Sequence, residues 1–124
     1  MSHGKIVLLS IAVAAIIFVG FGMWNRAQPG KYDGFAQCLA DEGATFYGAF
    51  WCPHCQEQKA MFGNSADLLP YQECSTPNGQ DQLAVCDEAG VTGYPTWKFA
   101  NGTTLSGTQT FAALAAQTNC ALPE

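Results

Sequence analysis

Two cysteines that are separated by two residues, Cys52 and Cys55, are the side chains of this sequence best suited to chemistry. They lie in the segment Trp51-Cys52-Pro53-His54-Cys55. A pair with this spacing can exchange two electrons by forming and breaking a disulfide, can bind a metal ion, or can form a purely structural disulfide. The elements on either side of the pair distinguish these alternatives.

The pair falls where an apolar strand stops and a helix begins. Residues 44–50 are rich in β-forming aromatic side chains and predict a buried strand. Residues 53–62 contain good helix formers, Pro53 fits the first helical turn, and Gly63 provides a stop. We therefore expect Cys52 at a helix N-terminus, where free amides and the helix dipole favour the thiolate that attacks disulfides.

The other uses of the pair fit less well. A zinc site needs a second cysteine pair of similar spacing, but Cys74 and Cys86 are separated by eleven residues. Covalent haem needs a histidine directly after the second cysteine, and that position is Gln56. Structural disulfides seldom lie at the start of a helix behind a buried strand. We expect a redox pair with no metal and no organic cofactor.

Composition and charge restrict the class of protein. The 124 residues contain six cysteines and carry a net charge of −5. Residues 27–124 keep all ten acidic residues but only three lysines, which gives them a net charge of −7. An acidic domain without a basic stripe is not expected to bind nucleic acid. So many cysteines in a short chain indicate an oxidising compartment outside the cytoplasm.

One long apolar segment precedes the cysteine-rich part. Residues 6–24 carry no charge and would span about 28 Å as a helix, close to the thickness of a bilayer core. We predict a single-pass membrane anchor in residues 1–26, a linker in 27–33 and one domain in 34–124. Flanking charges barely orient the helix, but the cysteines favour an extracytoplasmic domain. The alternative is a cleaved signal peptide, whose apolar region is usually shorter, about 7–15 residues.

The remaining elements predict an α/β domain with one mixed sheet. Asn101-Gly102 is a strong hairpin signal, which should pair residues 103–105 with the preceding strand. The other predicted elements are a helix at 35–40 with Asp33 as its N-cap, a strand at 69–74, a helix at 80–89, a strand at 97–100 and a last helix from Thr108 to about Cys120.

The motifs Phe50-Trp51-Cys52-Pro53-His54-Cys55 and Thr92-Gly93-Tyr94-Pro95-Thr96 together resemble the thioredoxin superfamily. With the Cys74 and Cys86 pair, they are most similar to the thioredoxin-like domain fused to vitamin K epoxide reductase homologues of cyanobacteria, other bacteria and plants. The resemblance covers residues 35–117. It implies a thioredoxin-like fold in which Cys52 and Cys55 are catalytic, Pro95 is cis, and Trp51, Tyr94 and Pro95 border the substrate groove.

Two departures from the family pattern matter. The fused proteins carry a quinone-reducing membrane module, whereas this sequence has a single apolar segment, so the resemblance implies a separate quinone-linked partner. Phe46 replaces the buried acid of thioredoxins, which leaves proton transfer at Cys55 without its usual group. Water or Glu57 could serve instead.

The two residues between the cysteines bear on the direction of electron flow. Thioredoxins usually have Gly-Pro at these positions, and the strongly oxidising DsbA-type proteins have Pro-His. His54 can stabilise the Cys52 thiolate by a hydrogen bond or positive charge, which makes the disulfide a better oxidant. Pro53 and His54 therefore favour oxidation of substrates. Alternatively, His54 is an exposed turn residue without this effect.

The pairing of the other four cysteines is the next question that the sequence raises. We expect a structural disulfide between Cys74 and Cys86, and the alternative is a second redox pair. Cys38 and Cys120 are the two cysteines that remain after the other four are paired, which favours a disulfide between them. Six cysteines nevertheless allow 15 connectivities. The first and last helices of a thioredoxin-like layout tend to lie on opposite faces of the sheet, which leaves this pairing open.

The sequence thus predicts a membrane-anchored extracytoplasmic thiol–disulfide oxidoreductase. It would donate disulfides to exported proteins and be reoxidised by a quinone-linked enzyme resembling vitamin K epoxide reductase. The alternatives are a tethered reductase for cytochrome maturation or disulfide repair, and a non-catalytic binding module with this fold.

Overall fold

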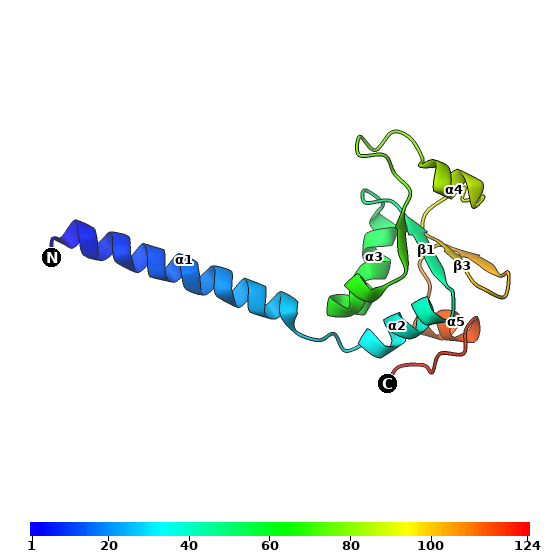
Figure 1. Ribbon diagram of the computed structural model, residues 1–124, viewed down its shortest axis with the longest axis horizontal. Helices are drawn as coiled ribbons and strands as arrows, with labels where there is room; N and C mark the ends of the chain where they lie inside the picture. The colour runs from blue at the N-terminus through cyan, green and yellow to red at the C-terminus, as the bar shows by residue number, and fades with distance from the viewer.

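The computed structural model describes residues 1–124 as a long N-terminal helix followed by a small α/β domain (Figure 1). Helix α1, His3–Ala27, projects away from the domain and buries none of its residues. It is long and apolar enough to cross a membrane, and at about 1.5 Å per residue it extends roughly 37 Å. A signal sequence would share these properties.

A four-stranded mixed sheet forms the centre of the domain, in the strand order β2-β1-β3-β4. Strand β1, Thr45–Gly48, pairs in parallel with β2, Tyr71–Glu73. On its other side, β1 pairs antiparallel with β3, Thr96–Lys98, which in turn pairs antiparallel with β4, Thr104–Ser106. The mixed sheet flanked by helices and the β3–β4 hairpin confirm the predicted thioredoxin-like fold class.

Five shorter helices complete the domain. They are α2 (Asp33–Asp41), α3 (Pro53–Phe62), the 3-10 helix η1 (Gly63–Leu68), α4 (Ala84–Glu88) and α5 (Phe111–Ala116). Helix α3 ends at Gly63, whose φ of 54° lies in the left-handed region that glycine adopts readily. The chain then continues directly into η1, which the sequence did not predict.

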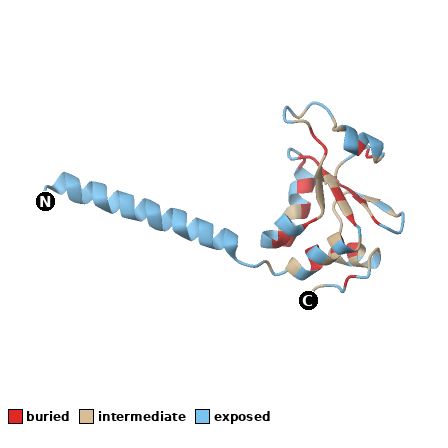
Figure 2. Cartoon of the chain, viewed as in Figure 1, coloured by how far each residue is buried: buried red, intermediate tan, exposed pale blue.

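The core lies mainly between the sheet and helices α2, α3 and α5 (Figure 2). Phe46 of β1 and Trp97 of β3 stack with their ring centroids 4.8 Å apart, and both side chains are fully buried. A smaller cluster around Cys74, Cys86 and Val91 packs beside Tyr47. Because neighbouring strand residues point to opposite faces, Phe46 and Tyr47 connect β1 to the two clusters.

Several helix boundaries differ from the sequence-based expectation, and α5 also ends earlier than expected, at Ala116 and not near Cys120. Helix α4 begins at Ala84 rather than at residue 80, because residues 75–82 form a loop with an isolated bridge between Ser75 and Gln82. Tyr32, not Asp33, is the N-cap of α2, since the Asp33 carboxylate accepts the Gly30 amide outside the helix. Helix α5 is capped by Thr110, whose hydroxyl accepts the Ala113 amide, and not by Thr108.

A disulfide between Cys38 and Cys120 joins α2 to the C-terminal segment across a sequence separation of 82 residues. The expectation that the first and last helices of the domain lie on opposite faces is wrong here. Phe35 and Leu39 of α2 belong to the same buried cluster as Leu114 of α5. Cys38, which lies within α2, and Cys120, which follows α5, are therefore close in space.

We expect the double variant Cys38→Ala, Cys120→Ala to lower the free energy of unfolding by about 4 to 5 kcal/mol. The long closed loop restricts the unfolded chain strongly in the loop-entropy model. Urea unfolding of the full chain in detergent, followed by tryptophan fluorescence, measures the change. A loss below about 1 kcal/mol would show that the crosslink does not restrain the unfolded state.

Candidate active site

The two central cysteines lie at the junction between β1 and α3. Cys52 is the N-cap of α3, and its sulfur accepts a hydrogen bond from the backbone N–H of Cys55 at 3.3 Å. Pro53 occupies the first turn, where no N–H is needed. Both thiols are free, whereas the other four cysteines form disulfides. The first turn of one helix thus fixes both sulfurs.

The two sulfurs have unequal surroundings. Cys55 is 1% exposed and Cys52 is 5% exposed. Burial, followed by the hydrogen bond between the two cysteine side chains, raises the pKa of Cys55 to about 12. Cys55 therefore remains a protonated thiol at neutral pH, and Cys52 is the sulfur available for the first attack.

The loop before β3 closes over Cys52. The Tyr94–Pro95 peptide bond is cis, and the Cys52 thiol donates to the Tyr94 carbonyl oxygen at 3.7 Å. The rings of Trp51 and Tyr94 meet edge to face with centroids 5.9 Å apart. Trp51 is about half exposed, while Pro95 is buried. Of these residues, which we expect to border a substrate groove, Tyr94 contacts the Cys52 sulfur through its carbonyl oxygen.

His54 points away from the sulfurs toward solvent. Its Nδ1 lies 3.2 Å from the Glu57 carboxylate, and both side chains are well exposed. The structure contains no hydrogen bond between His54 and Cys52, so any influence of His54 on Cys52 must come through charge.

The loop that contains Phe50 and Trp51 is held by the last residue of β2 and by a residue just after the strand. Glu73 Oε1 accepts the backbone N–H groups of Phe50 and Ser75 at 3.2 and 2.9 Å. Ser75 Oγ in turn accepts the Trp51 indole N–H at 2.9 Å. The Cys74–Cys86 disulfide lies between these two supporting residues and ties them to α4. It therefore anchors the rim of the site.

Gln58 is a fully buried polar residue of α3 that the sequence analysis missed. Its Oε1 accepts the Trp97 indole N–H at 3.1 Å and the Gln109 N–H at 2.7 Å, and its Nε2 donates to the Gln109 carbonyl at 3.1 Å. A signal was present, because Gln58 follows Cys55 by three residues and shares its helix face. The side chain fixes α3 to β3 and to the segment before α5.

Tyr71 and Glu73 of β2 were also missed as site residues. The Tyr71 hydroxyl donates to Glu73 Oε2 at 2.7 Å, and Lys59 Nζ lies 3.5 Å from the Tyr71 ring centroid. Burial and the bond to Glu73 raise the pKa of Tyr71. Sequence reasoning could not find this cluster, because it forms only when β2 pairs with β1.

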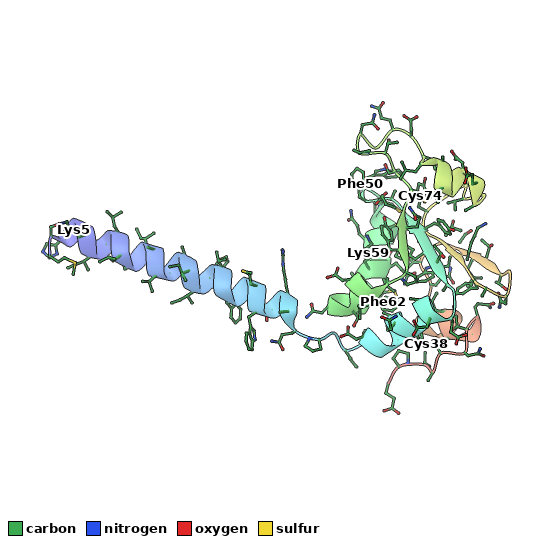
Figure 3. The ribbon with its side chains drawn as sticks, in the orientation of Figure 1. Lys5, Cys38, Phe50, Lys59, Phe62 and Cys74 are labelled. Atoms are coloured by element: carbon green, nitrogen blue, oxygen red, sulfur yellow. A yellow bond between two sulfur atoms is a disulfide. The ribbon has the colours of Figure 1, made fainter.

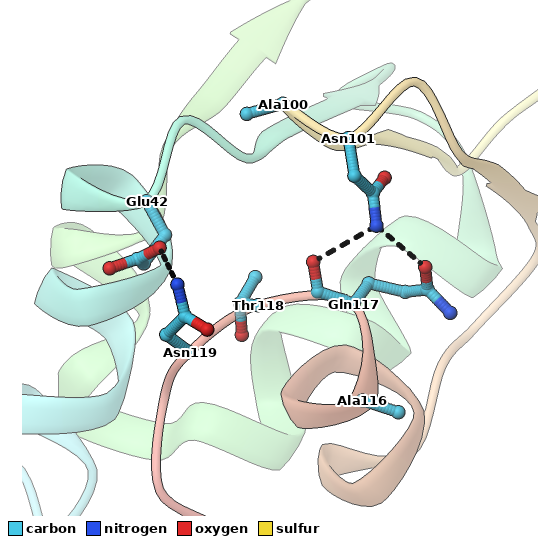
Figure 4. A pocket seen from close by; sticks show the side chains of 7 residues that line it. All are labelled: Glu42, Ala100, Asn101, Ala116, Gln117, Thr118 and Asn119. Atoms are coloured by element: carbon cyan, nitrogen blue, oxygen red, sulfur yellow. Dashed lines mark hydrogen bonds between the residues drawn. The ribbon is translucent and has the colours of Figure 1, made fainter.

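Cavities elsewhere do not include the cysteine pair. A polar cavity of about 430 Å³ lies between the end of α2, the β3–β4 hairpin and the end of α5 (Figure 4). Asn119 donates to Glu42 and Asn101 donates to Gln117 at its edges. Figure 3 shows Cys38 at the opposite end of the domain from Phe50, which precedes the cysteine pair.

No group of three or more His, Cys, Asp or Glu side chains is placed to hold a metal ion.

The comparisons with known proteins agree with this geometry. No protein-family model matches the chain. The chain is 44% identical over 94 residues to a curated protein of Arabidopsis thaliana named thiol-disulfide oxidoreductase LTO1. The aligned region covers 72% of this chain but only 24% of the relative. The fold and the free cysteine pair define the class of a thiol–disulfide oxidoreductase, and the relative's name agrees with it.

In the native reduced protein, we expect iodoacetamide at about pH 7 to label Cys52 and to leave Cys55 unmodified. Cys55 is less exposed, and its raised pKa keeps it protonated until the pH approaches 12. Peptide mapping by mass spectrometry measures the label at each cysteine. In urea, both cysteines should react alike, and equal labelling in the folded protein would contradict the asymmetry.

We expect Gln58→Leu to lower the free energy of unfolding by about 3 kcal/mol, because it leaves the buried Trp97 indole N–H and the part-buried N–H and carbonyl of Gln109 without partners. Gln37→Leu on the exposed face of α2 is the matched control and should change stability by less than about 0.5 kcal/mol. Urea unfolding measures both. Similar stabilities for the two variants would show that the Gln58 bonds are not needed.

Proposed function

We propose that this protein is a membrane-anchored thiol–disulfide oxidoreductase that donates disulfides to exported proteins. The observation that carries the proposal is the pair of free thiols at the start of α3, with Cys52 beneath the Tyr94 carbonyl and Cys55 in the core. This arrangement separates an attacking sulfur from a resolving sulfur. The proposed catalytic residues are Cys52 and Cys55.

The reaction begins from the Cys52–Cys55 disulfide. A substrate thiolate attacks Cys52, a substrate–Cys52 disulfide forms, and Cys55 leaves as a thiolate that takes up a proton. A second substrate thiolate then attacks the substrate sulfur of this mixed disulfide and releases Cys52. The substrate loses two electrons and gains a disulfide, and the enzyme ends as the dithiol that the structure contains.

Two features support an oxidising compartment outside the cytoplasm. The Cys38–Cys120 and Cys74–Cys86 disulfides are typical of exported domains, since cytosolic thiols are kept reduced. Helix α1 has the length and composition of a membrane anchor, with the domain following it. In the proposal, α1 crosses the membrane and the domain faces the periplasm or a lumen.

The dithiol must pass two electrons to an acceptor before the next cycle. We propose that this acceptor is a separate quinone-linked membrane enzyme resembling vitamin K epoxide reductase, and α1 as a membrane anchor would place the domain at the same membrane. Its tether would keep the domain close to such a partner. The chain spans about a quarter of the length of its named relative, so the relative's substrates and partners are not transferred here.

The proposed groove gives the site access to unfolded polypeptides. Trp51 and Phe50 are both about half exposed beside the buried Cys52 sulfur. Their aromatic surface can bind apolar side chains on either side of a substrate cysteine. Tyr94 and Pro95 complete the border, and this surface provides binding without requiring one particular sequence.

Cys55→Ala should accumulate mixed disulfides at Cys52 in membranes, because the Cys52 thiolate can still attack a disulfide of a substrate or partner, while Cys55, which would release the bound protein by closing the Cys52–Cys55 disulfide, is absent. Non-reducing electrophoresis followed by mass spectrometry identifies the trapped proteins, and a reductant should release them. The double variant Cys52→Ala, Cys55→Ala is the control and should trap nothing. If Cys55→Ala trapped no protein, a non-catalytic binding module would explain the fold better.

The same membranes test the direction of electron flow. A disulfide donor should hold Cys52 and Cys55 mainly oxidised at steady state, as measured by alkylation after acid quenching. A mainly reduced pair would contradict the proposed direction and favour a tethered reductase.

A further inference from the structure

Cys55 must lose or gain a proton in every cycle of the proposed function, on which this inference rests. The residue is 1% exposed, so bulk water does not reach its sulfur freely. Phe46, which precedes it on β1 in the same core, offers no polar atom. The proton therefore needs a route through polar side chains that reach the core from another element.

Gly48 shows where that route begins. A Cβ at residue 48 would lie 3.0 Å from the Cys55 sulfur and 3.3 Å from the Tyr71 hydroxyl oxygen. The two atoms thus face the same small space above a glycine. The same Cβ would be 2.8 Å from the Tyr71 ring, so only glycine allows Tyr71 to approach the sulfur this closely.

Tyr71 connects this space to a carboxylate. Its hydroxyl donates to Glu73 Oε2 at 2.7 Å, while Oε1 of the same carboxylate is occupied by the amides of Phe50 and Ser75. On its other side, the Tyr71 ring lies under Lys59 and borders an open cavity of about 280 Å³. Tyr71 therefore joins the buried sulfur to groups near solvent.

The other charged or titratable groups around Cys55 are few. Cys52 and Lys59 lie on its own helix and act on its ionisation in opposite directions. Tyr94 approaches from the loop before β3, but its hydroxyl is committed to Gln82. His54 and Glu57 pair with each other in solvent. Tyr71 with Glu73 is the polar pair directed toward the sulfur.

We propose that Tyr71 and Glu73 form the proton-transfer route of Cys55. When Cys55 resolves a mixed disulfide, its S–H bond breaks as the Cys55–Cys52 bond forms. The Tyr71 hydroxyl oxygen takes this proton and passes its own proton to Glu73. The substrate sulfur leaves with the electron pair of its broken bond to Cys52. In the oxidising direction the same transfers run in reverse and protonate the departing Cys55 thiolate.

Within this route, Tyr71 is the group beside the reacting sulfur, and Glu73 acts through it. Lys59 favours the ionised form of Cys55, which assists the departure of the proton. Both variants Tyr71→Phe and Glu73→Gln remove the route with little change in shape. Glu73→Gln also keeps the Oε1 acceptor for the amides of Phe50 and Ser75.

The test uses the full reduced chain in detergent and the chromogenic reagent dithiobis(nitrobenzoate). Attack by Cys52 releases a first nitrothiobenzoate, and resolution by Cys55 releases a second one. The remaining cysteines are in disulfides and do not react. Stopped-flow absorbance therefore separates the two steps.

In Tyr71→Phe and Glu73→Gln, we expect the first phase to remain unchanged and the second phase to slow roughly 10²-fold at neutral pH. The slowed phase should accelerate about tenfold per pH unit, because hydroxide must replace the lost route. Tyr47→Phe on the opposite face of β1 and Glu88→Gln on exposed α4 are matched controls and should leave both phases unchanged.

Three results would overturn the inference. They are a second phase like that of the unchanged protein in either variant, equal slowing of both phases, and slowing without a change in the pH profile. If Glu73→Gln fails to fold, Tyr71→Phe decides alone. A chain that shows no first phase would instead contradict the proposed function, so the two failures are distinguishable.

Discussion

The site depends on one hydrogen bond at the start of α3, from the Cys55 amide to the Cys52 sulfur. A helix N-terminus has amide groups without intrahelical partners, and here a sulfur takes the place of the usual capping oxygen. The second cysteine, Cys55, follows three residues later in the same turn and is buried in the core. One element therefore produces two buried cysteines with unequal exposure, 5% for Cys52 and 1% for Cys55.

Helix α3 is held in place by contacts with β3, with the segment before α5 and with α2. Gln58 fixes it to Trp97 and Gln109, and Phe62 packs into the aromatic cluster near Phe35. On the opposite side of the site, Glu73 and Ser75 fix the loop before the helix. The two cysteines lie between these supports, which fix the loop and the helix that carry them.

The two disulfides act at different ends of the domain. Cys74–Cys86 supports the loop that contacts Trp51, whereas Cys38–Cys120 closes the core far from the thiols. This division leaves the free pair as the reactive part of an otherwise crosslinked domain. It also explains how about 90 residues with short strands and short helices can form a stable core.

Local patterns predicted the strand–helix junction well. The change from aromatic residues to helix formers at Pro53, the stop at Gly63 and the turn at Asn101-Gly102 all correspond to observed boundaries. These features depend on residues close in sequence, which explains the agreement. The helix expected from residue 80 was too long, because the backbone N–H groups of Gln80 and Asp81 donate to the side chains of Asn78 and Thr76 in the loop before it.

Features that depend on long-range contacts could not be predicted in the same way. The approach of Tyr71 to Cys55 requires the register of β2 on β1 and a glycine at 48. The pairing of Cys38 with Cys120 requires α2 and α5 to share one core cluster. Neither arrangement leaves a periodic signal in the sequence, since each joins segments that are far apart along the chain.

The central claim is that Cys52 and Cys55 alone form the exchangeable pair of this domain. Equilibration with glutathione buffers of graded potential, followed by peptide mapping after alkylation, tests it directly. The account predicts that this pair converts between dithiol and disulfide in one two-electron step while the other four cysteines stay bonded. A second pair that opens at the same potential, or a Cys52–Cys55 pair that never closes, would contradict it.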